Sequence, residues 1–253
     1  MNYYVGTVIF LMGLFIGSFL NVCIYRIPEG KSIAVPPSSC MKCGARIKWY
    51  DLIPVVSYLV LKGRCRNCGE KISPRYMLVE LLTGVLFLVC FMAFGLTGQF
   101  FAFVVLTGIL ITITFTDIDS QIIPDSVMIF GLIAGVVFVV LGFVPESASL
   151  KENALAALLG LVCGAGSLII INLLSLAIIK KAGIGGGDIK LMGVAGIFLG
   201  MTKTISALVM GIIIGGVFSI FALKKRRTQE AKNDSETEEG GDEKFHETPF
   251  GPY

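Results

Sequence analysis

Two aspartates beside apolar segments are the residues of this sequence best suited to catalysis. Asp117 ends one apolar run, and Asp188 opens another directly after a glycine-rich stretch. Acids beside membrane-spanning segments are costly and are functional candidates. Two close carboxylates share a proton, so one can deprotonate water while the other polarises a carbonyl, and the pair titrates as a unit. The pattern indicates an aspartyl dyad, although spacing alone does not select Asp117 over Asp119.

Each neighbouring acid also has a plainer interpretation. Asp125 follows Pro124 and is expected to be a helix N-cap, a role that Asp188 could also fill. Asp119 is expected to be solvated in a short turn. Glu80 lies one turn into an apolar segment, where an internal ion pair is as reasonable as a functional role.

The stretch 183–187 contains four glycines in five residues, among them Gly185 and Gly187. Such a stretch is a poor helix former and predicts a non-helical entry that another backbone can approach closely. Irregular backbone at membrane depth is tolerated where protein buries it or where it lines a wet cavity.

Four cysteines form two C-x-x-C pairs, Cys40 with Cys43 and Cys65 with Cys68. Residues 43–47 and 68–72 continue alike, which gives a short repeat with a period of 25. Two such turns complete a tetrahedral four-cysteine zinc site, and with all ligands from protein the zinc would be structural. Free thiols or a redox pair are the alternative. Cys23, Cys90 and Cys163 lie in apolar runs and are given no function.

The elements that position these residues follow from composition. The chain has 253 residues, of which 55% are apolar and only 15% charged, and its mean hydropathy is +0.82. A soluble domain carries about 25% charge. The net charge of +3 argues against a nucleic-acid partner. Charges concentrate in 26–75 and 224–247, the layout of a polytopic membrane protein whose partner is the lipid bilayer.

We expect an all-α membrane protein with about seven transmembrane helices and a small zinc-ribbon-like insertion. The expected spans are 4–25, 76–95, 100–116, 126–144, 154–179, 189–201 and 204–223. The expected domains are a first transmembrane helix (1–25), the four-cysteine segment (26–75), a six-helix core (76–223) and a disordered acidic tail (224–253). Three G-x-x-x-G pairs predict close helix packing: Gly13 with Gly17, Gly160 with Gly164, and Gly211 with Gly215.

Orientation follows from the basic residues. Segment 26–75 holds ten Lys and Arg against three acids, and further basic residues flank 181–187 and follow the last span. The positive-inside rule places all of them in the cytoplasm, with the N-terminus outside. The four cysteines and both candidate aspartates then lie at the cytoplasmic face of the membrane.

Several motifs, in their order along the chain, resemble those of the bacterial type IV prepilin peptidases, GxGD-type aspartyl proteases. The motifs are Gly17-Ser18-Phe19-Leu20-Asn21-Val22, Ile53-Pro54-Val55-Val56-Ser57-Tyr58-Leu59, Arg75-Tyr76-x-x-Val79-Glu80, Asp117-Ile118-Asp119-x-x-x-Ile123-Pro124-Asp125 and Gly185-Gly186-Gly187-Asp188-x-Lys190. The two cysteine pairs correspond to the family's zinc tetrad. The resemblance selects Asp117 and Asp188 as catalytic, with Gly185, Gly187, Lys190, Asp119 and Asp125 supporting the site.

The resemblance implies two reactions on prepilins or pseudopilins of pilus, secretion or competence systems. One removes a short basic leader after a glycine, and the other methylates the new N-terminus from S-adenosylmethionine. It does not locate the methyl-donor site, for which the weak candidates are Glu70 and Glu80, together with Glu29 and Asp51. The family typically has a further transmembrane helix after a Pro-Phe-Gly-Pro motif, and the sequence ends at Tyr253 directly after that motif.

Two alternatives stay open. A presenilin-like intramembrane protease shares the G-x-G-D motif but transfers no methyl group. A zinc-ribbon membrane assembly factor or proton-coupled carrier would use the acids without proteolysis.

Overall fold

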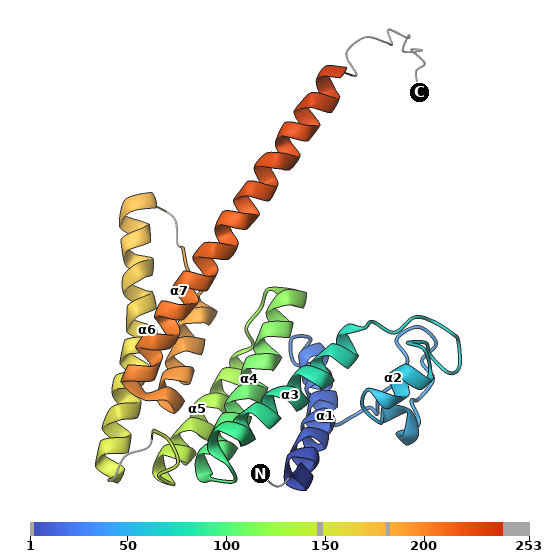
Figure 1. Cartoon of the computed structure of the whole chain (residues 1–253), viewed down its shortest axis with the longest axis horizontal. Helices are drawn as coiled ribbons and strands as arrows, with labels where there is room; N and C mark the ends of the chain where they lie inside the picture. The colour runs from blue at the N-terminus through green and yellow to red at the C-terminus, as the bar shows by residue number, and fades with distance from the viewer. Residues whose placement is uncertain (1–2, 146–148, 181–182, 240–253) are drawn as a thin grey trace. The chain divides into compact units, whose positions relative to one another are not determined.

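The computed structural model describes residues 3–145, 149–180 and 183–239, with side chains through residue 217 apart from that of Ile179. The described residues are helical apart from loops and two isolated β-bridges. In chain order the elements are α1 (Tyr3–Arg26), the 3-10 helix η1 (Trp49–Leu52), α2 (Val56–Val60), α3 (Arg75–Phe94), α4 (Gly98–Ser120), α5 (Asp125–Val140), α6 (Leu150–Ile179) and α7 (Gly186–Glu239), as Figure 1 shows.

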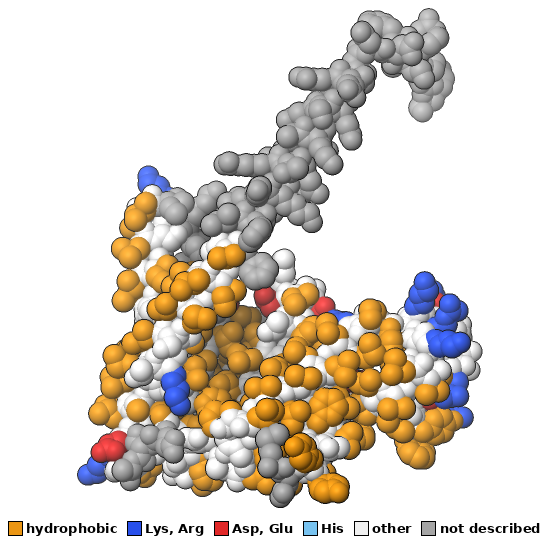
Figure 2. Space-filling model, in the orientation of Figure 1, with side chains coloured by type: hydrophobic (Ala, Val, Ile, Leu, Met, Phe, Trp, Pro, Cys, Tyr) orange, Lys and Arg blue, Asp and Glu red, His pale blue; other side chains and the backbone are white. Residues whose placement is uncertain are grey.

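Five helices are long and apolar enough to span a membrane: α1, α3, α4, α6 and α7 as far as Val217. The apolar helix α5 is shorter, with 16 residues. The sixth and seventh expected spans fall within α7, where Gly200 interrupts the helical backbone with a φ of +69°. Only glycine adopts such a conformation without cost. The predicted all-α membrane architecture is confirmed, and many apolar side chains face outward, as Figure 2 shows.

The chain divides into two compact units, residues 1–205 and 206–253. In the second unit α7 continues as a helix to Glu239. Residues 224–239, which we expected to be disordered with the rest of the tail, are therefore helical. This part of the chain is rich in Lys, Arg and Glu, which are good helix formers and can prolong an apolar helix. Residues 240–253, including the Pro-Phe-Gly-Pro motif, lie outside the described residues.

Small residues let α1 pack closely against α3. A Cβ atom on Gly13 would lie 2.7 Å from the Cα of Gly84, and one on Gly17 would lie 2.7 Å from the Cα of Glu80. Real Cβ atoms do not approach so closely, so any larger residue would push the helices apart. The close packing predicted from this G-x-x-x-G pair is confirmed.

Helices α6 and α7 meet in the same way. A Cβ atom on Gly160 would overlap the carbonyl of Gly196, and one on Gly164 would overlap the carbonyl of Met192. Gly211 and Gly215 differ, because nothing among the described residues lies within 4 Å of their Cβ positions. The prediction of close packing therefore holds for two of the three glycine pairs.

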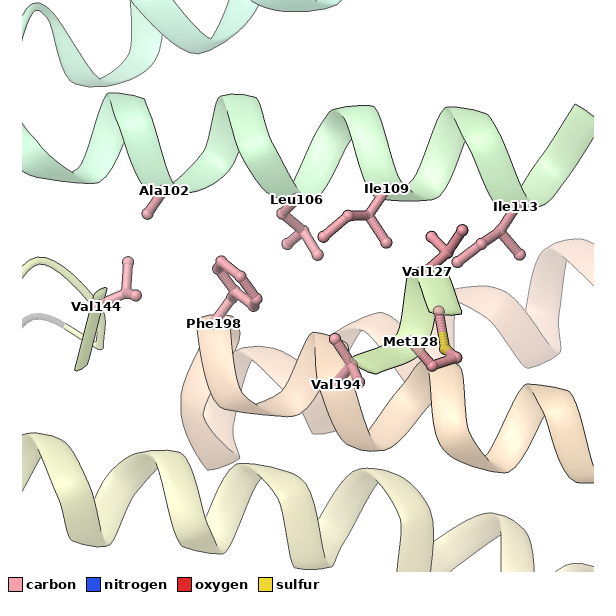
Figure 3. Packing of buried hydrophobic residues seen from close by; sticks show 9 residues of the cluster. All are labelled: Ala102, Leu106, Ile109, Ile113, Val127, Met128, Val144, Val194 and Phe198. Carbon is pink, nitrogen blue, oxygen red and sulfur yellow. The ribbon is translucent and has the colours of Figure 1, made fainter. Parts of the chain in front are cut away.

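An apolar core joins α4, α5 and the first half of α7 (Figure 3). Ile113 of α4 lies beside Val127 of α5 at one end of this cluster, and Phe198 of α7 lies closer to Leu106 of α4 toward the other end. Ile123, in the connection between α4 and α5, and Leu191 pack against the same cluster. This core fixes the end of α4 relative to the starts of α5 and α7, which are the segments that carry the candidate aspartates.

Candidate active site and cysteine cluster

Asp117 and Asp188 each lie about one turn beyond the shared apolar core. Asp117 is in the last turn of α4, one turn after the buried Ile113, and its carbonyl accepts the N–H of Gln121 at 2.8 Å. Asp188 is in the first turn of α7, three residues before Leu191. Residues three or four apart share a helix face. Each acid therefore lies on a helix face that also contributes to the shared apolar core. Both side chains lie beyond that core and are exposed.

Helix α7 begins within the glycine-rich stretch, earlier than expected. The helix begins at Gly186, so the non-helical entry is limited to residues before it. The side-chain oxygen of Asn172 accepts the N–H groups of Gly183 at 3.1 Å and Ile184 at 3.3 Å. The close approach that the structure shows is inside the helix and is made by a side chain and not by a backbone, since a Cβ atom on Gly187 would lie 2.8 Å from the Cδ1 of Ile123. Gly187 thus allows the first turn of α7 to sit against the α4–α5 connection.

Lys190 and Asp125 form an ion pair, with Nζ 2.5 Å from Oδ1. The pair joins the first turn of α7 to the first turn of α5. Asp125 is not the N-cap that the sequence suggested, because Pro124 occupies that position and Asp125 lies inside the helix. Both side chains are more than half exposed, so solvent screens the pair and its role is positional more than stabilising.

A second ion pair joins Asp119 to Arg75. The prediction that Asp119 lies in a short turn is wrong, because residues 117–120 remain helical and form the end of α4. Asp119 is exposed, as expected, but it has an ionic partner. The two side chains are only 33% and 22% exposed. Arg75 directly follows the four-cysteine segment, so this pair ties that segment's end to α4, two residues beyond Asp117.

Glu80 accepts a backbone hydrogen bond instead of forming an ion pair. Its side chain is buried, and its Oε2 lies 2.7 Å from the N–H of Val55. Val55 has φ +62° and ψ −51°, and the N–H of Val56 reaches the carbonyl of Pro54 at 2.6 Å. A γ-turn of this sign is rare, especially at a β-branched residue. Two features of the sequence could have pointed to this contact: Pro54 before two valines, and Glu80 as a lone acid inside an apolar segment.

The four cysteines converge as predicted. Their sulfur atoms all lie within 4.8 Å of one another, and the Sγ atoms of Cys40 and Cys68 are 3.8 Å apart. A tetrahedral site with Zn–S bonds of about 2.3 Å has sulfur–sulfur edges of about 3.8 Å. The cluster is therefore close to the size that such an ion requires, and it can hold a metal.

The two halves of the cluster are built alike. In each half, the N–H of the glycine after the second cysteine donates to the carbonyl oxygen of the first cysteine. The distances are 2.9 Å for Gly44 to Cys40 and 2.9 Å for Gly69 to Cys65. Both glycines have a φ near +70°, at 69° and 71°, which glycine adopts most easily. A β-bridge follows each turn, Ser39 with Arg46 and Arg64 with Lys71. The 25-residue repeat is thus a structural repeat.

The electrostatics of the cluster suit a cation. Backbone N–H groups lower the pKa of the Cys40, Cys43 and Cys65 thiols. The N–H of Glu70 also lowers the pKa of Cys68, but desolvation and the three neighbouring thiol groups outweigh it and raise that pKa to about 12. Four adjacent thiolates repel one another unless a metal neutralises them, and metal binding deprotonates thiols.

The four acids considered for methyl-donor binding all have partners within the chain. Besides Glu80, Asp51 pairs with Arg66 at 2.7 Å, Glu70 with Lys42 at 3.0 Å and Glu29 with Lys31 at 2.5 Å. The Arg66 guanidinium lowers the pKa of Asp51. Arg66 lies between Cys65 and Cys68, so its pair with Asp51 fastens η1 to the second cysteine turn.

The fold and the two sites define a multi-pass membrane protein with acids gathered at one end of its helices and a four-thiol cluster beside them. The chain belongs to the type IV leader peptidase family, whose model matches residues 104–220. The bacterial peptidase A24 N-terminal domain matches residues 11–94. The resemblance found in the motifs is thereby confirmed.

Three relatives carry the name prepilin leader peptidase/N-methyltransferase. The protein of Myxococcus xanthus is 37% identical over 215 residues, which is 85% of this chain and 62% of that protein. The protein of Neisseria gonorrhoeae is 35% identical over 83% of this chain and 79% of its own length. The protein of Bacillus subtilis is 34% identical over 86% and 83%, respectively. No solved structure matches the chain.

Proposed function

We propose that this protein is a membrane aspartyl endopeptidase that removes the leader of type IV prepilins or pseudopilins and methylates the new N-terminus. The observation that carries the proposal is the placement of Asp117 and Asp188 beyond one shared core, in a chain of the leader peptidase family. The names of the relatives support both activities.

In the proposed cleavage, the two aspartates hold one proton between them. The ionised carboxylate takes a proton from water, and the water oxygen attacks the scissile carbonyl while the protonated carboxyl group polarises it. The peptide bond then breaks, and the amine leaves with a proton returned by the dyad. Gly187 and Lys190 hold the turn that carries Asp188, and Asp119 holds the helix end that carries Asp117.

We place this site at the cytoplasmic face of a bacterial plasma membrane. The excess of Lys and Arg in 26–75 supports that orientation. The ion pairs Arg75–Asp119 and Lys190–Asp125 join residues of this end of the helices. A substrate with a basic leader in the cytoplasm and an apolar helix in the membrane would present its cleavage point at this boundary.

For the metal site we propose zinc, held by Cys40, Cys43, Cys65 and Cys68 in a structural role. The sulfur spacing and the four protein ligands support it, because a catalytic zinc would keep an open position. We expect one zinc per chain, lost in Cys40→Ser or Cys65→Ser and kept in the matched variant Cys163→Ser. Metal analysis of freshly purified protein that finds no zinc contradicts the assignment.

The methyl transfer would use S-adenosylmethionine, from which a methyl group passes to the new α-amine. The relatives' name supports this activity. Glu70 and Glu80 remain the proposed donor-binding acids, and each would have to exchange its present partner, Lys42 or the Val55 N–H, for the donor.

The deciding experiment incubates the purified protein and S-adenosylmethionine with a prepilin that retains its first helix. Mass spectrometry should show loss of the leader after a glycine and one added methyl group on the product. Cleavage without methylation favours the presenilin-like alternative. Absence of cleavage, combined with pH-driven flux in liposomes, favours the carrier.

A further inference from the structure

A group of apolar side chains on the four-cysteine segment is exposed, although the ring of Trp49 also contacts that of Tyr50 edge-to-face. It comprises Trp49, Leu52, Val56, Leu59 and Val60, and we refer to it as the η1–α2 face. Trp49 is 79%, Leu59 62% and Val60 70% exposed. In Figure 2, hydrophobic side chains cover the lower part of this segment in the view, and Lys and Arg side chains gather along its upper and outer edge.

The contact between Glu80 and Val55 sets the depth of this face. Glu80 lies five residues into α3, about 7.5 Å along the helix axis from Arg75 at its start. Its carboxylate binds the N–H of Val55 at 2.7 Å, and Val55 immediately precedes α2. The turn before α2 therefore lies beside the first turns of a membrane-spanning helix and not above them. Interfacial helices bury their apolar face about 5–10 Å into the headgroup and acyl boundary.

Basic side chains lie where lipid headgroups would be. Lys62, Arg64 and Lys71 are exposed and line a cavity of about 430 Å³ that Tyr58 and residues 72–74 complete, directly before α3. Clusters of Lys and Arg beside a membrane span attract anionic lipids. An exposed tryptophan, such as Trp49 in the same segment, is also typical of the membrane interface, where an aromatic ring sits at headgroup level.

We propose that the η1–α2 face docks into the bilayer leaflet that α1 and α3 enter, with the basic cluster against anionic lipid phosphates. The occupant is the lipid interface, because the hydrogen bond from Val55 to Glu80 holds the start of α2 beside the first turns of a membrane-spanning helix and because the same segment carries exposed positive charge. This inference does not depend on the proposed cleavage chemistry.

Trp49 is the only tryptophan of the chain, so its fluorescence reports the position of η1 without any substitution. We would reconstitute the full protein, without substrate, in vesicles of phosphatidylcholine and phosphatidylglycerol. Lipids brominated near the top of the acyl chain should quench Trp49, and aqueous iodide should quench it severalfold less than it quenches a free tryptophan analogue. Strong iodide quenching without lipid quenching overturns the proposal.

A double variant tests the face itself. Leu59→Glu with Val60→Glu should restore iodide quenching severalfold while zinc content stays unchanged, because both side chains are exposed and should not be needed for folding. The matched control Leu96→Glu places a charge on an exposed apolar residue of the α3–α4 connection and should leave Trp49 unchanged. If Trp49 is protected only after a prepilin is added, the face binds a peptide and the lipid proposal is wrong.

Discussion

At the scale of single residues, the charged side chains near the two candidate aspartates hold turns and helix ends in place. Arg75 and Asp119 join α3 to α4, and Lys190 and Asp125 join α7 to α5. Glu80 differs from these because it is buried and binds backbone. Its position inside an apolar helix is costly, and the hydrogen bond to a conformationally rare residue explains why an acceptor is needed there.

Two replacements of Glu80 distinguish the loss of its hydrogen-bond acceptor from the change in its side-chain volume. Glu80→Leu removes the acceptor of the partly buried Val55 N–H, so the free energy of unfolding in detergent should fall by about 1–3 kcal/mol. Glu80→Gln keeps an acceptor oxygen of the same reach and should lose less. Equal losses in the two variants would show that the hydrogen bond to Val55 does not carry the effect.

The sequence predicted these residues unevenly, for a physical reason. The cysteine tetrad was recognisable because its ligands repeat at short, regular spacing. The partners of Asp119, Asp125 and Glu80 were missed because the partner lies on another element, 44, 65 or 25 positions away. Local patterns hold no information on such pairs, so the plainer interpretations as solvated acid, cap or ion pair were all reasonable.

At the scale of elements, glycines set how closely the helices approach. Gly160 and Gly196 bring α6 and α7 into backbone contact, and Gly13 does the same for α1 and α3. Length and hydropathy predicted the helices well, because lipid forces backbone hydrogen bonds to be made within each span. They predicted two separate last spans, whereas the structure has both within α7, divided by the non-helical backbone of Gly200.

The close contact between α6 and α7 predicts different stability effects for two glycine replacements in α6. Gly160→Ala should destabilise the protein by about 1–3 kcal/mol, because its Cβ would overlap the carbonyl of Gly196. Gly166→Ala in the same helix has open space around the new atom, so it should be neutral or slightly stabilising. Thermal unfolding of both variants in the same detergent measures the difference. Similar melting temperatures would argue against the close contact.

At the scale of the whole molecule, the contacts link the four-cysteine segment to the helices that carry the aspartates. Glu80 holds the segment at Val55, and Arg75 at its end holds α4 close to Asp117. A shared core then aligns α4 with the start of α7. Through this chain of contacts, the insertion would support the proposed dyad without contributing a residue to it, and the proposed zinc would stabilise the insertion.

The most direct test of the account is the cleavage rate of single and double aspartate variants on a prepilin substrate. If Asp117 and Asp188 act as one unit, Asp117→Asn and Asp188→Asn should each lower the rate on the order of a thousandfold or more, and the double variant should lose little beyond that. Glu152→Gln, an exposed acid in the first turn of α6, should cleave normally. Substantial cleavage by either single variant, in protein that folds and binds zinc, would contradict the dyad.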